Sequence, residues 1–495
     1  MTQFVPDPRR WKALAVILTA GFMTLLDVSI VNTALPSMQR DLHATIGGIQ
    51  WVVSGYALTF GLVLVTSGRL GDALGRRRMF LLALAGFVFT SALAGASPNE
   101  TMLVIGRLLQ GVAAGMLTPQ NSGLIQDLFR GAERGRAFGM FGAVVGISTA
   151  VGPILGGLIL AAFGDPGGWR WVFYVNVPIG AVAFALALRL LPKTPRRQRK
   201  LREEIDFVGV LLLGLAVLCV LLPLIQSEQG GLRELWWLFP LALVFGGVFV
   251  WWEQRMVGRG HPPLLDTRLF TETPGFAPGV AVGAIYFCGF GGIWLVFAIF
   301  FQQGLGYTPL QSGLSVTVFA IGSSVSAAVA GRLVGRWGRR LTIAGLTMVA
   351  FGLLVVAIVI GQVPARLAGT AIALPLLIAG IGSGMVISPN TTLTVECVPT
   401  RMAGVAGGVL QTGQRIGTAI GTAVIASVFH AVVTSSGGRY PVALSVAMLC
   451  SAGLTLIALG VAIAELHGRE RRATLSEAER AACAADASAA DIQRS

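Results

Sequence analysis

Charged side chains are scarce in this chain of 495 residues. Asp, Glu, Lys and Arg together make up 12 % of it, whereas hydrophobic residues make up 54 %. Globular domains in water carry about 25 % charged residues, and a chain of this size could not cover its surface with so few. The shortage of charge excludes a water-soluble protein and indicates that lipid is the main solvent.

Cysteine and histidine are also rare, with five and four residues scattered along the chain. No group of them has the spacing of a metal site or a disulfide framework, so we expect the cysteines to be small buried hydrophobes. The histidines lie far apart, and none is near a carboxylate motif. A membrane enzyme with a metal cluster or paired catalytic side chains is therefore disfavoured, and we expect no catalysis, metal ion or bound cofactor.

Long apolar segments account for most of the chain. A helix needs about 20 apolar residues to cross a bilayer, and fourteen segments are long enough. They lie at about 13–34, 48–68, 79–97, 101–125, 136–161, 171–190, 207–226, 235–252, 275–301, 309–331, 341–362, 367–390, 402–430 and 440–464. The first is too long for a cleavable signal peptide. The sequence thus predicts an all-α polytopic membrane protein with 14 transmembrane helices.

The positive charges lie mostly on one side of these spans. Of the 37 Lys and Arg residues, Arg107 and Arg415 fall within spans, and only five fall in connections on the side opposite the N-terminus. These five are Arg40, Arg170, Arg233, Arg366 and Arg439. Basic connections stay in the cytoplasm, so we expect both termini to be cytoplasmic. The same rule explains the net charge of +14 without nucleic acid as a partner.

A hinge rich in Gly and Arg occurs twice, at 68–78 and at 331–340, and each copy joins two apolar segments. Gly115–Pro119 is likewise echoed by Gly384–Pro389, with one residue inserted. Internal repeats of this kind are typical of secondary transporters. We predict a six-helix half at 1–190, a basic linker with two extra helices and a following loop at 191–274, a second six-helix half at 275–465 and a cytoplasmic tail at 466–495. The Ala-rich tail is expected to be disordered or marginally helical.

Asp27 is the one carboxylate placed deep in a span, and Arg107 is one of two deep arginines. A helix rises about 1.5 Å per residue, so Asp27 lies roughly 20 Å from the inner end of its span and Arg107 roughly 9 Å from the outer end of its own. In a hydrocarbon core about 30 Å thick, the two share nearly the same depth. We expect them to pair, directly or through water, in a functional site. A purely structural ion pair is the alternative.

Polar and aromatic side chains supply further candidates for substrate contact. Arg415 lies midway along 402–430 with Gln411 and Gln414 on the same helix face, and this stripe faces either a cavity or a neighbouring helix. Aromatic side chains are able to line a pocket for a lipophilic cation through cation–π contacts, although packing is the commoner role of any one of them. The aromatic candidates are Phe22, Trp51, Tyr56, Phe60, Tyr286, Phe287, Phe290 and Trp294.

Two further groups indicate gating. The run 152–157 contains Pro153, which removes a helix hydrogen bond, and three glycines, which let another helix approach closely. These glycines are Gly152, Gly156 and Gly157. The run predicts a kinked packing helix, a pivot in alternating access, or both. Asp72 and Arg76 in the first hinge, together with Asp127, form pairs worth about 0–1 kcal/mol when exposed, which is enough to bias two conformations of similar energy.

With these motifs the chain resembles the major facilitator superfamily and, within it, the fourteen-helix drug:proton antiporter family, over about residues 13–464. The motifs that carry the resemblance are Leu26–Pro36, the 68–78 hinge, Arg107–Gly111, Gly152–Gly157, Trp169–Gly180 and Gln302–Tyr307. The resemblance implies that Asp27 couples protons and senses cations, with Arg107 as its proton-relay partner.

The resemblance also implies that Asp72 and Arg76 form a cytoplasmic latch, with Asp127 as a partner. The chain departs from the superfamily at Ala73, where the hinge usually has Arg, and at Gly335, where the second copy lacks the acid. These departures predict a latch that is weaker than usual or divided between the halves.

We predict a proton-coupled antiporter that exports lipophilic drugs or antibiotics, expected to be cations, across the bacterial inner membrane by alternating access. Its partners are the substrate, protons and membrane lipid, and we expect a monomer driven by the proton gradient alone. Substrate contact is assigned to Asp27, Gln411, Arg415 and the aromatic candidates other than Phe287. The alternative is a dedicated exporter of one metabolite, such as an antibiotic, siderophore, lipid precursor or amino acid. The run 152–157 disfavours an importer, and the lack of a filter-like repeat disfavours a channel.

Overall fold

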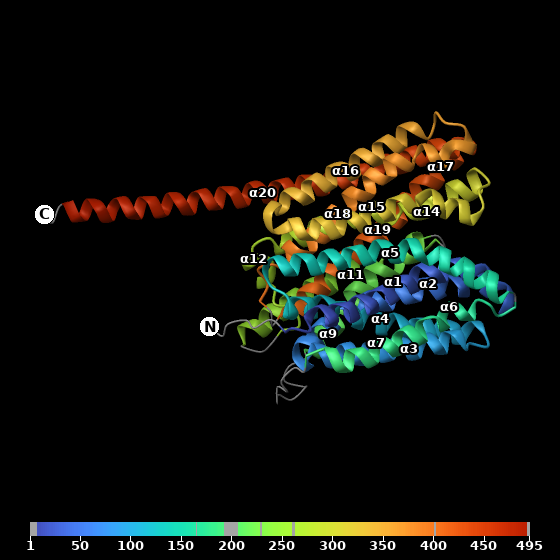
Figure 1. Ribbon diagram of the computed structural model, residues 1–495, viewed down its shortest axis with the longest axis horizontal. Helices are drawn as coiled ribbons and strands as arrows, with labels where there is room; N and C mark the ends of the chain where they lie inside the picture. Colours follow the sequence, from blue (N-terminus) through green and yellow to red (C-terminus); the bar gives the residue numbers. More distant parts are fainter. Residues whose placement is uncertain are drawn as a thin grey trace.

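The computed structural model describes residues 7–164, 166–192, 206–227, 230–259, 263–399 and 402–492. Within these ranges the chain is helical and contains no strand, which confirms the predicted all-α class. Figure 1 shows two bundles of long helices side by side, one from the first part of the chain and one from the last. Most of the predicted basic linker, residues 193–205, lies outside the described residues.

The first bundle has six membrane-length segments, the last of which is divided into α6 and α7. Its helices are α1 (Arg10–Asp41), α2 (Ile46–Leu74), α3 (Arg76–Gly95), α4 (Glu100–Leu128), α5 (Gly131–Phe163), α6 (Arg170–Tyr174) and α7 (Asn176–Leu190). Polar caps begin two of them, because the side chains of Thr45 and Asn99 accept hydrogen bonds from free backbone N–H groups of α2 and α4. Helix α4 packs on α2 and α3, and α1 packs on α5.

The second bundle repeats this plan, with α18 on α15 and α16, and α13 on α19. Its elements are α13 (Phe276–Gly291), α14 (Ile293–Ile299), the π-helix η2 (Phe300–Gly304), α15 (Pro309–Trp337), α16 (Arg339–Val359), the 3₁₀ helix η3 (Ala365–Leu367), α17 (Ala368–Ala371), α18 (Ala373–Thr394), α19 (Ala403–Ser435) and α20 (Tyr440–Ile492). The predicted span 275–301 is therefore interrupted at Gly292. Helix α20 continues far beyond the bundle (Figure 1), so the tail takes the helical one of its two predicted states.

Two further helices, α9 (Phe207–Ile225) and α11 (Leu238–Gly258), pack on each other, and α9 also contacts α2 and α19. The short helices nearby are α10 (Gly231–Glu234) and α12 (Arg268–Glu272). Thirteen helices of the described chain are long and apolar enough to cross a membrane, and α11 is not among them. Helix α11 contains Glu253, Gln254 and Arg255 in its last two turns, and they shorten its apolar run. Helix length and hydropathy thus give thirteen candidate spans in the described chain rather than the predicted fourteen.

The two Gly- and Arg-rich hinges form matching turns. Gly75 and Gly338 have φ angles of 99° and 50°, a region that other residues rarely adopt. Each glycine ends one helix and begins the next. We call the end of the molecule that holds these turns the hinge end.

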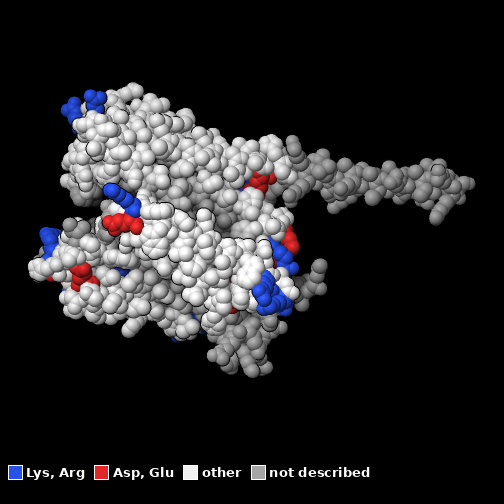
Figure 2. Space-filling model, turned by 180° about the vertical axis from the view of Figure 1, so that it is seen from behind, with Lys and Arg blue, Asp and Glu red and all other residues white. Residues whose placement is uncertain are grey.

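Charged side chains gather toward the two ends of the molecule, and Figure 2 shows a wide uncharged band between them. Large apolar side chains such as Leu82, Phe89 and Val325 are exposed on the surface. In water such a surface would be costly, whereas in a bilayer it faces lipid tails. Together with the apolar helices, this makes the protein a multi-pass membrane protein.

The two bundles touch mainly through α2 with α19 and through α5 with α15. Glycines allow the closest approaches, since Gly68 faces Gly404 and Gly331 faces Gly135. Each of these pairs joins the first glycine of a hinge copy to the start of a helix in the other bundle. The bundles are therefore closed against each other at the hinge end, a state that we call hinge-closed.

Candidate functional site

A buried ion pair lies at the centre of the first bundle. Asp27 of α1 is fully buried, and its Oδ2 lies 2.6 Å from Nη1 of Arg107 on α4. The other carboxylate oxygen accepts hydrogen bonds from the side-chain amides of Gln110, at 3.0 Å, and Asn176, at 3.1 Å. The predicted pairing of Asp27 with Arg107 is thus direct, and three donors hold the carboxylate.

Arg107 has further partners besides Asp27. Its Nε donates to the carbonyl of Val52 at 2.9 Å, and its Nη1 also donates to Oε1 of Gln110 at 2.8 Å. Its Cζ lies 4.2 Å from the centre of the Tyr56 ring, within the range of a cation–π contact. Because the pair is so well enclosed, removal of either charge would leave the other uncompensated in a medium of low dielectric constant.

The sequence argument found the two charges but missed the amides around them. Gln110 lies three residues after Arg107, so helix periodicity was a usable signal that both share one face. Asn176 lies on α7, far along the chain, and only the packing of α7 on α1 and α3 brings it to Asp27. Its one signal in the sequence was its place in the Trp169–Gly180 motif, which did not indicate contact with Asp27.

An aromatic bridge leads from this ion pair to the second bundle. The Tyr56 ring stacks on Phe60 with a centroid separation of 6.1 Å, and Cζ of Arg415 on α19 lies 4.4 Å from the centre of the Phe60 ring. The two arginines thus lie at opposite ends of a stacked aromatic pair on α2. Predicted site residues from α4, α2 and α19 thus form one continuous group: Arg107, Tyr56, Phe60 and Arg415.

The aromatic candidates of α13 and α14 lie elsewhere. Tyr286 is buried and donates a hydrogen bond of 2.7 Å to Oγ of Ser383. Phe290 contacts Trp294 at 5.3 Å, and Trp294 contacts Phe319 at 4.9 Å between centroids. Phe287 belongs to the same group. These rings pack in or against the apolar core of the second bundle.

The remaining substrate candidates differ in their surroundings. Trp51 packs against a cluster formed by Leu58 of α2 and by Val217 and Leu221 of the extra helix α9. Phe22 and Gln411 are both partly exposed. The structure therefore does not bring the whole predicted set together around Asp27.

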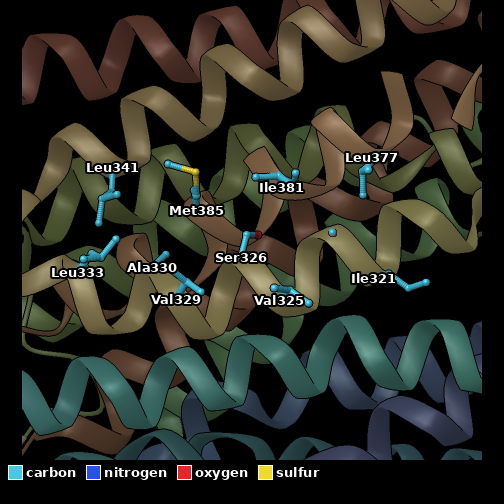
Figure 3. Close-up of a pocket in the computed structure, with 11 residues that line it drawn as sticks. Ile321, Val325, Ser326, Val329, Ala330, Leu333, Leu341, Leu377, Ile381 and Met385 are labelled. Carbon is cyan, nitrogen blue, oxygen red and sulfur yellow. The ribbon is translucent and has the colours of Figure 1, made fainter. Parts of the chain in front are cut away.

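A separate cavity of about 420 Å³ lies between α15, α16 and α18 (Figure 3). Its walls are apolar apart from Ser326, and Ile321, Val325 and Val329 at its rim are exposed on the outer surface. None of the predicted site residues lines it. It is a groove on the lipid-facing side of the second bundle and is not continuous with the ion pair.

The predicted latch residues meet at the hinge end. Asp72 lies 2.7 Å from Arg76, which lies 2.5 Å from Asp127. The Asp72 carboxylate also accepts hydrogen bonds from the backbone N–H groups of Gly404, at 3.1 Å, and Val405, at 3.0 Å. These groups begin α19, where free N–H groups and the helix dipole favour an anion. The latch thus connects the two bundles.

In the second hinge copy, the arginine that corresponds to Arg76 makes its contacts within its own bundle. Arg339 donates to Oδ1 of Asn390 at 2.5 Å and forms an ion pair with Glu465 of α20. Gly335 stands where the first copy has Asp72, so this copy has no carboxylate to offer to the start of α5. The sequence argument anticipated the missing acid but not the ion pair with α20.

Comparison with known proteins places this architecture. The profile of the Major Facilitator Superfamily matches residues 17–422, which is most of the chain. The chain belongs to the Major Facilitator Superfamily. The fold agrees, since the structure of the human organic anion transporter MFSD10 matches with a TM-score of 0.68 at 15 % identity, covering 92 % of this chain and 100 % of that one.

Several curated members of this superfamily are similar over most of their length. A probable actinorhodin transporter of Streptomyces coelicolor is 35 % identical over 87 % of this chain and 74 % of that protein. The multidrug resistance protein Stp of Mycobacterium tuberculosis is 33 % identical over 83 % of this chain and 74 % of that protein. The protein is therefore a membrane transporter of the superfamily with antibiotic and multidrug transporters among its relatives.

In this transporter we expect Asp72→Asn to slow transport roughly 10-fold. The substitution removes the charge from the hydrogen bonds of Asp72 with the start of α19, each worth about 1.5–3 kcal/mol, and these exist in the hinge-closed state alone. The measurement is the initial rate of dye transport in proteoliposomes. Glu133→Gln is the control, because Glu133 pairs with Arg10 inside the first bundle at the same end. The control should change the rate by less than about twofold. Equal effects of the two substitutions would contradict a role for Asp72 between the bundles.

The glycine run of α5 has two unlike faces. Gly152 lies against Ser29 of α1, and a Cβ added at Gly156 would lie 3.1 Å from Cβ of Thr33. A Cβ at Gly157 would meet nothing within 4 Å, and Pro153 is exposed within the continuous helix. Packing of α5 on α1 therefore requires Gly152 and Gly156, whereas Gly157 lies on the open face.

Gly152→Val should reduce transport roughly 10-fold, because overpacking the contact between α5 and α1 costs about 1–3 kcal/mol. Gly157→Val, the matched control on the same helix, should retain transport within about twofold. Both variants are compared with wild type by dye transport and by thermal unfolding. Loss of transport in the Gly157 variant alone would show that the assignment of the two faces is wrong.

Proposed function

We propose that this transporter is a proton-coupled antiporter that exports a lipophilic drug or antibiotic across the bacterial inner membrane by alternating access. The observation that carries the proposal is the fully buried Asp27 carboxylate, held midway along a membrane helix by Arg107 and two amides. Burying an acid at this depth is costly, and acids in membrane helices typically serve a function. The relatives named for actinorhodin transport and for multidrug resistance support the direction and the kind of cargo.

In the proposed cycle, Asp27 is the proton-binding group. Protonation would neutralise the carboxylate and leave Arg107 without its counter-ion. Arg107 would then shift against Tyr56, and the aromatic bridge would carry the change to Arg415 on α19. The start of α19 also donates a hydrogen bond to Asp72 at the hinge end, so the same helix would couple proton binding to the latch. Two states biased by one proton are sufficient for alternating access.

The proposed orientation places the hinge end and both termini in the cytoplasm, following the distribution of basic residues. The hinge-closed state would then be open to the outside. One proton entering per cycle would contribute about 1.4 kcal/mol for each unit of the pH gradient and about 2.3 kcal/mol for each 100 mV of membrane potential.

The test is dye transport by purified protein in liposomes with an imposed pH gradient, using a cationic, a neutral and an anionic lipophilic dye. We expect saturable movement of at least one dye that stops when a protonophore collapses the gradient. Movement at the same rate without a gradient would refute proton coupling, and movement that does not saturate would indicate a channel.

A dedicated exporter of one compound is the second candidate. It is favoured by the similarity to a transporter named for the single antibiotic actinorhodin. Breadth of resistance separates the two functions: a multidrug exporter should protect sensitive cells from several unrelated compounds, and a dedicated exporter from one.

A further inference from the structure

Arg415 has an unusual position for a charged side chain. Helix α19 begins at Ala403, so Arg415 lies roughly 18 Å along it, near the middle of a hydrocarbon core about 30 Å thick. The side chain is partly exposed, although its neighbour Gln414 is buried. Arg415 is therefore partly accessible where α19 packs on α2 of the other bundle.

No carboxylate among the described residues pairs with Arg415; its recorded contact is the Phe60 ring. The acid at this depth is Asp27, whose two oxygens are already taken by Arg107, Gln110 and Asn176. At the ends of the aromatic bridge, the charge of Arg107 is neutralised by Asp27, whereas the charge of Arg415 has no carboxylate partner among the described residues. The central region thus carries one positive charge in excess.

The chemistry of Arg415 suits an anion beside an aromatic ring. A guanidinium group offers planar, parallel N–H donors that match a carboxylate or phenolate oxygen. The Phe60 ring beneath it is buried and stacked on Tyr56. It contacts the flat face of the guanidinium group, which leaves the in-plane N–H donors available to an anion. A cation would meet repulsion from Arg415 and could not reach Asp27, which is enclosed in this state.

We propose that the substrate site of this transporter selects lipophilic anions, with Arg415 binding the anionic group and Phe60 orienting the guanidinium group. The inference rests on the proposed export function and replaces the sequence-based expectation of a cationic cargo. Arg415 is then a specificity-determining residue, and Asp27 remains the proton-binding group.

The experiment uses two dyes with the same xanthene ring system and opposite charge: fluorescein, an anion, and the methyl ester of tetramethylrhodamine, a cation. Equilibrium binding to the full-length protein in detergent is measured by fluorescence polarisation at mildly alkaline pH. Wild type should bind fluorescein roughly 10-fold or more tightly than the rhodamine ester, the effect of one charge-assisted hydrogen bond. Preference for the rhodamine ester would overturn the proposal without any variant.

Arg415→Gln should weaken fluorescein binding roughly 10-fold and leave the rhodamine ester unchanged or bound more tightly. Arg415→Lys keeps the charge and should retain part of the preference. Arg439→Gln, in an exposed connection, is the control and should change neither affinity. An equal loss of both dyes in the Gln and Lys variants, with wild-type thermal unfolding, would show that Arg415 only packs α19 against α2.

Binding without a gradient separates this proposal from the antiport proposal. Fluorescein binding that depends on Arg415, without gradient-driven movement of any dye, would refute proton coupling and retain the anion site. Gradient-driven movement of the rhodamine ester but not of fluorescein would retain antiport and refute the anion site.

Discussion

Exchange of Asp27 for Asn is expected to abolish gradient-driven transport and to lower the stability of the protein. Transport should fall roughly 100-fold or more, the scale on which loss of a positioned proton-transfer group acts. The substitution leaves the Arg107 charge buried and unpaired, which costs about 3–5 kcal/mol. The new side-chain amide can be accommodated. Oδ1 of Asn176 has no hydrogen-bond partner within the described residues, so it can accept a hydrogen bond from the amide N–H of the new side chain once the Asn176 side chain rotates.

A double variant separates coupling from packing. Asp27→Asn combined with Arg107→Gln removes both charges, so most of the lost stability should return, while transport driven by the pH gradient should stay absent. The measurements are dye transport in proteoliposomes and thermal unfolding. Recovery of transport together with stability would show that the ion pair only holds α1 and α4 together, the structural alternative.

Gly331→Val is expected to cause the second large loss, again roughly 100-fold, by preventing the hinge-closed state. A Cβ at Gly331 would lie 2.5 Å from the carbonyl oxygen of Gly135 and 2.5 Å from Cα of Gly139. These are backbone atoms of α5, which cannot turn aside as a side chain can. A cost of about 3 kcal/mol on one of two states shifts their ratio by roughly 100-fold.

The control for this substitution is Gly335→Val, one helical turn further along α15, where an added Cβ meets nothing within 4 Å. Spin labels at Arg136 and Arg332, both exposed beside the contact, report the separation of the bundles. The distance should lengthen in the Gly331 variant and stay unchanged in the control. An unchanged distance together with full transport in both variants would refute the requirement for close contact.

The depth of the charged site residues in the membrane could be predicted from the sequence. Rise per residue placed Asp27 and Arg107 at one level, and the structure joins them. Helix periodicity also put Gln414 on one face with Arg415, but Gln414 lies beside Gly283 of α13 and Arg415 over Phe60 of α2. By contrast, the latch could not be completed, because the partners of Asp72 across the interface are backbone N–H groups at the start of α19. Such groups exist in every helix and leave no mark in the amino-acid sequence.

The aromatic candidates show a second limit. Composition says that a ring prefers an apolar environment, but a core, a lipid face and a substrate cavity all provide one. Tyr56 and Phe60 reached the ion pair, whereas the rings of α13 and α14 joined the core of their own bundle. The extra helices set a third limit, because the polar end of α11 left its apolar run short of a clear span.

The ion pair of Arg339 with Glu465 has a consequence for how damage to the two hinge copies would appear in a cell. Arg76 holds Asp72, whose carboxylate contacts the start of α19. In the proposed cycle that contact forms and breaks, so a defect there would slow turnover in a normally assembled protein. Arg339 instead fastens α16 to α20 within the second bundle. A defect there would leave that helix without its anchor during biogenesis and would be seen as less protein in the membrane rather than as slower export by the molecules that reach it.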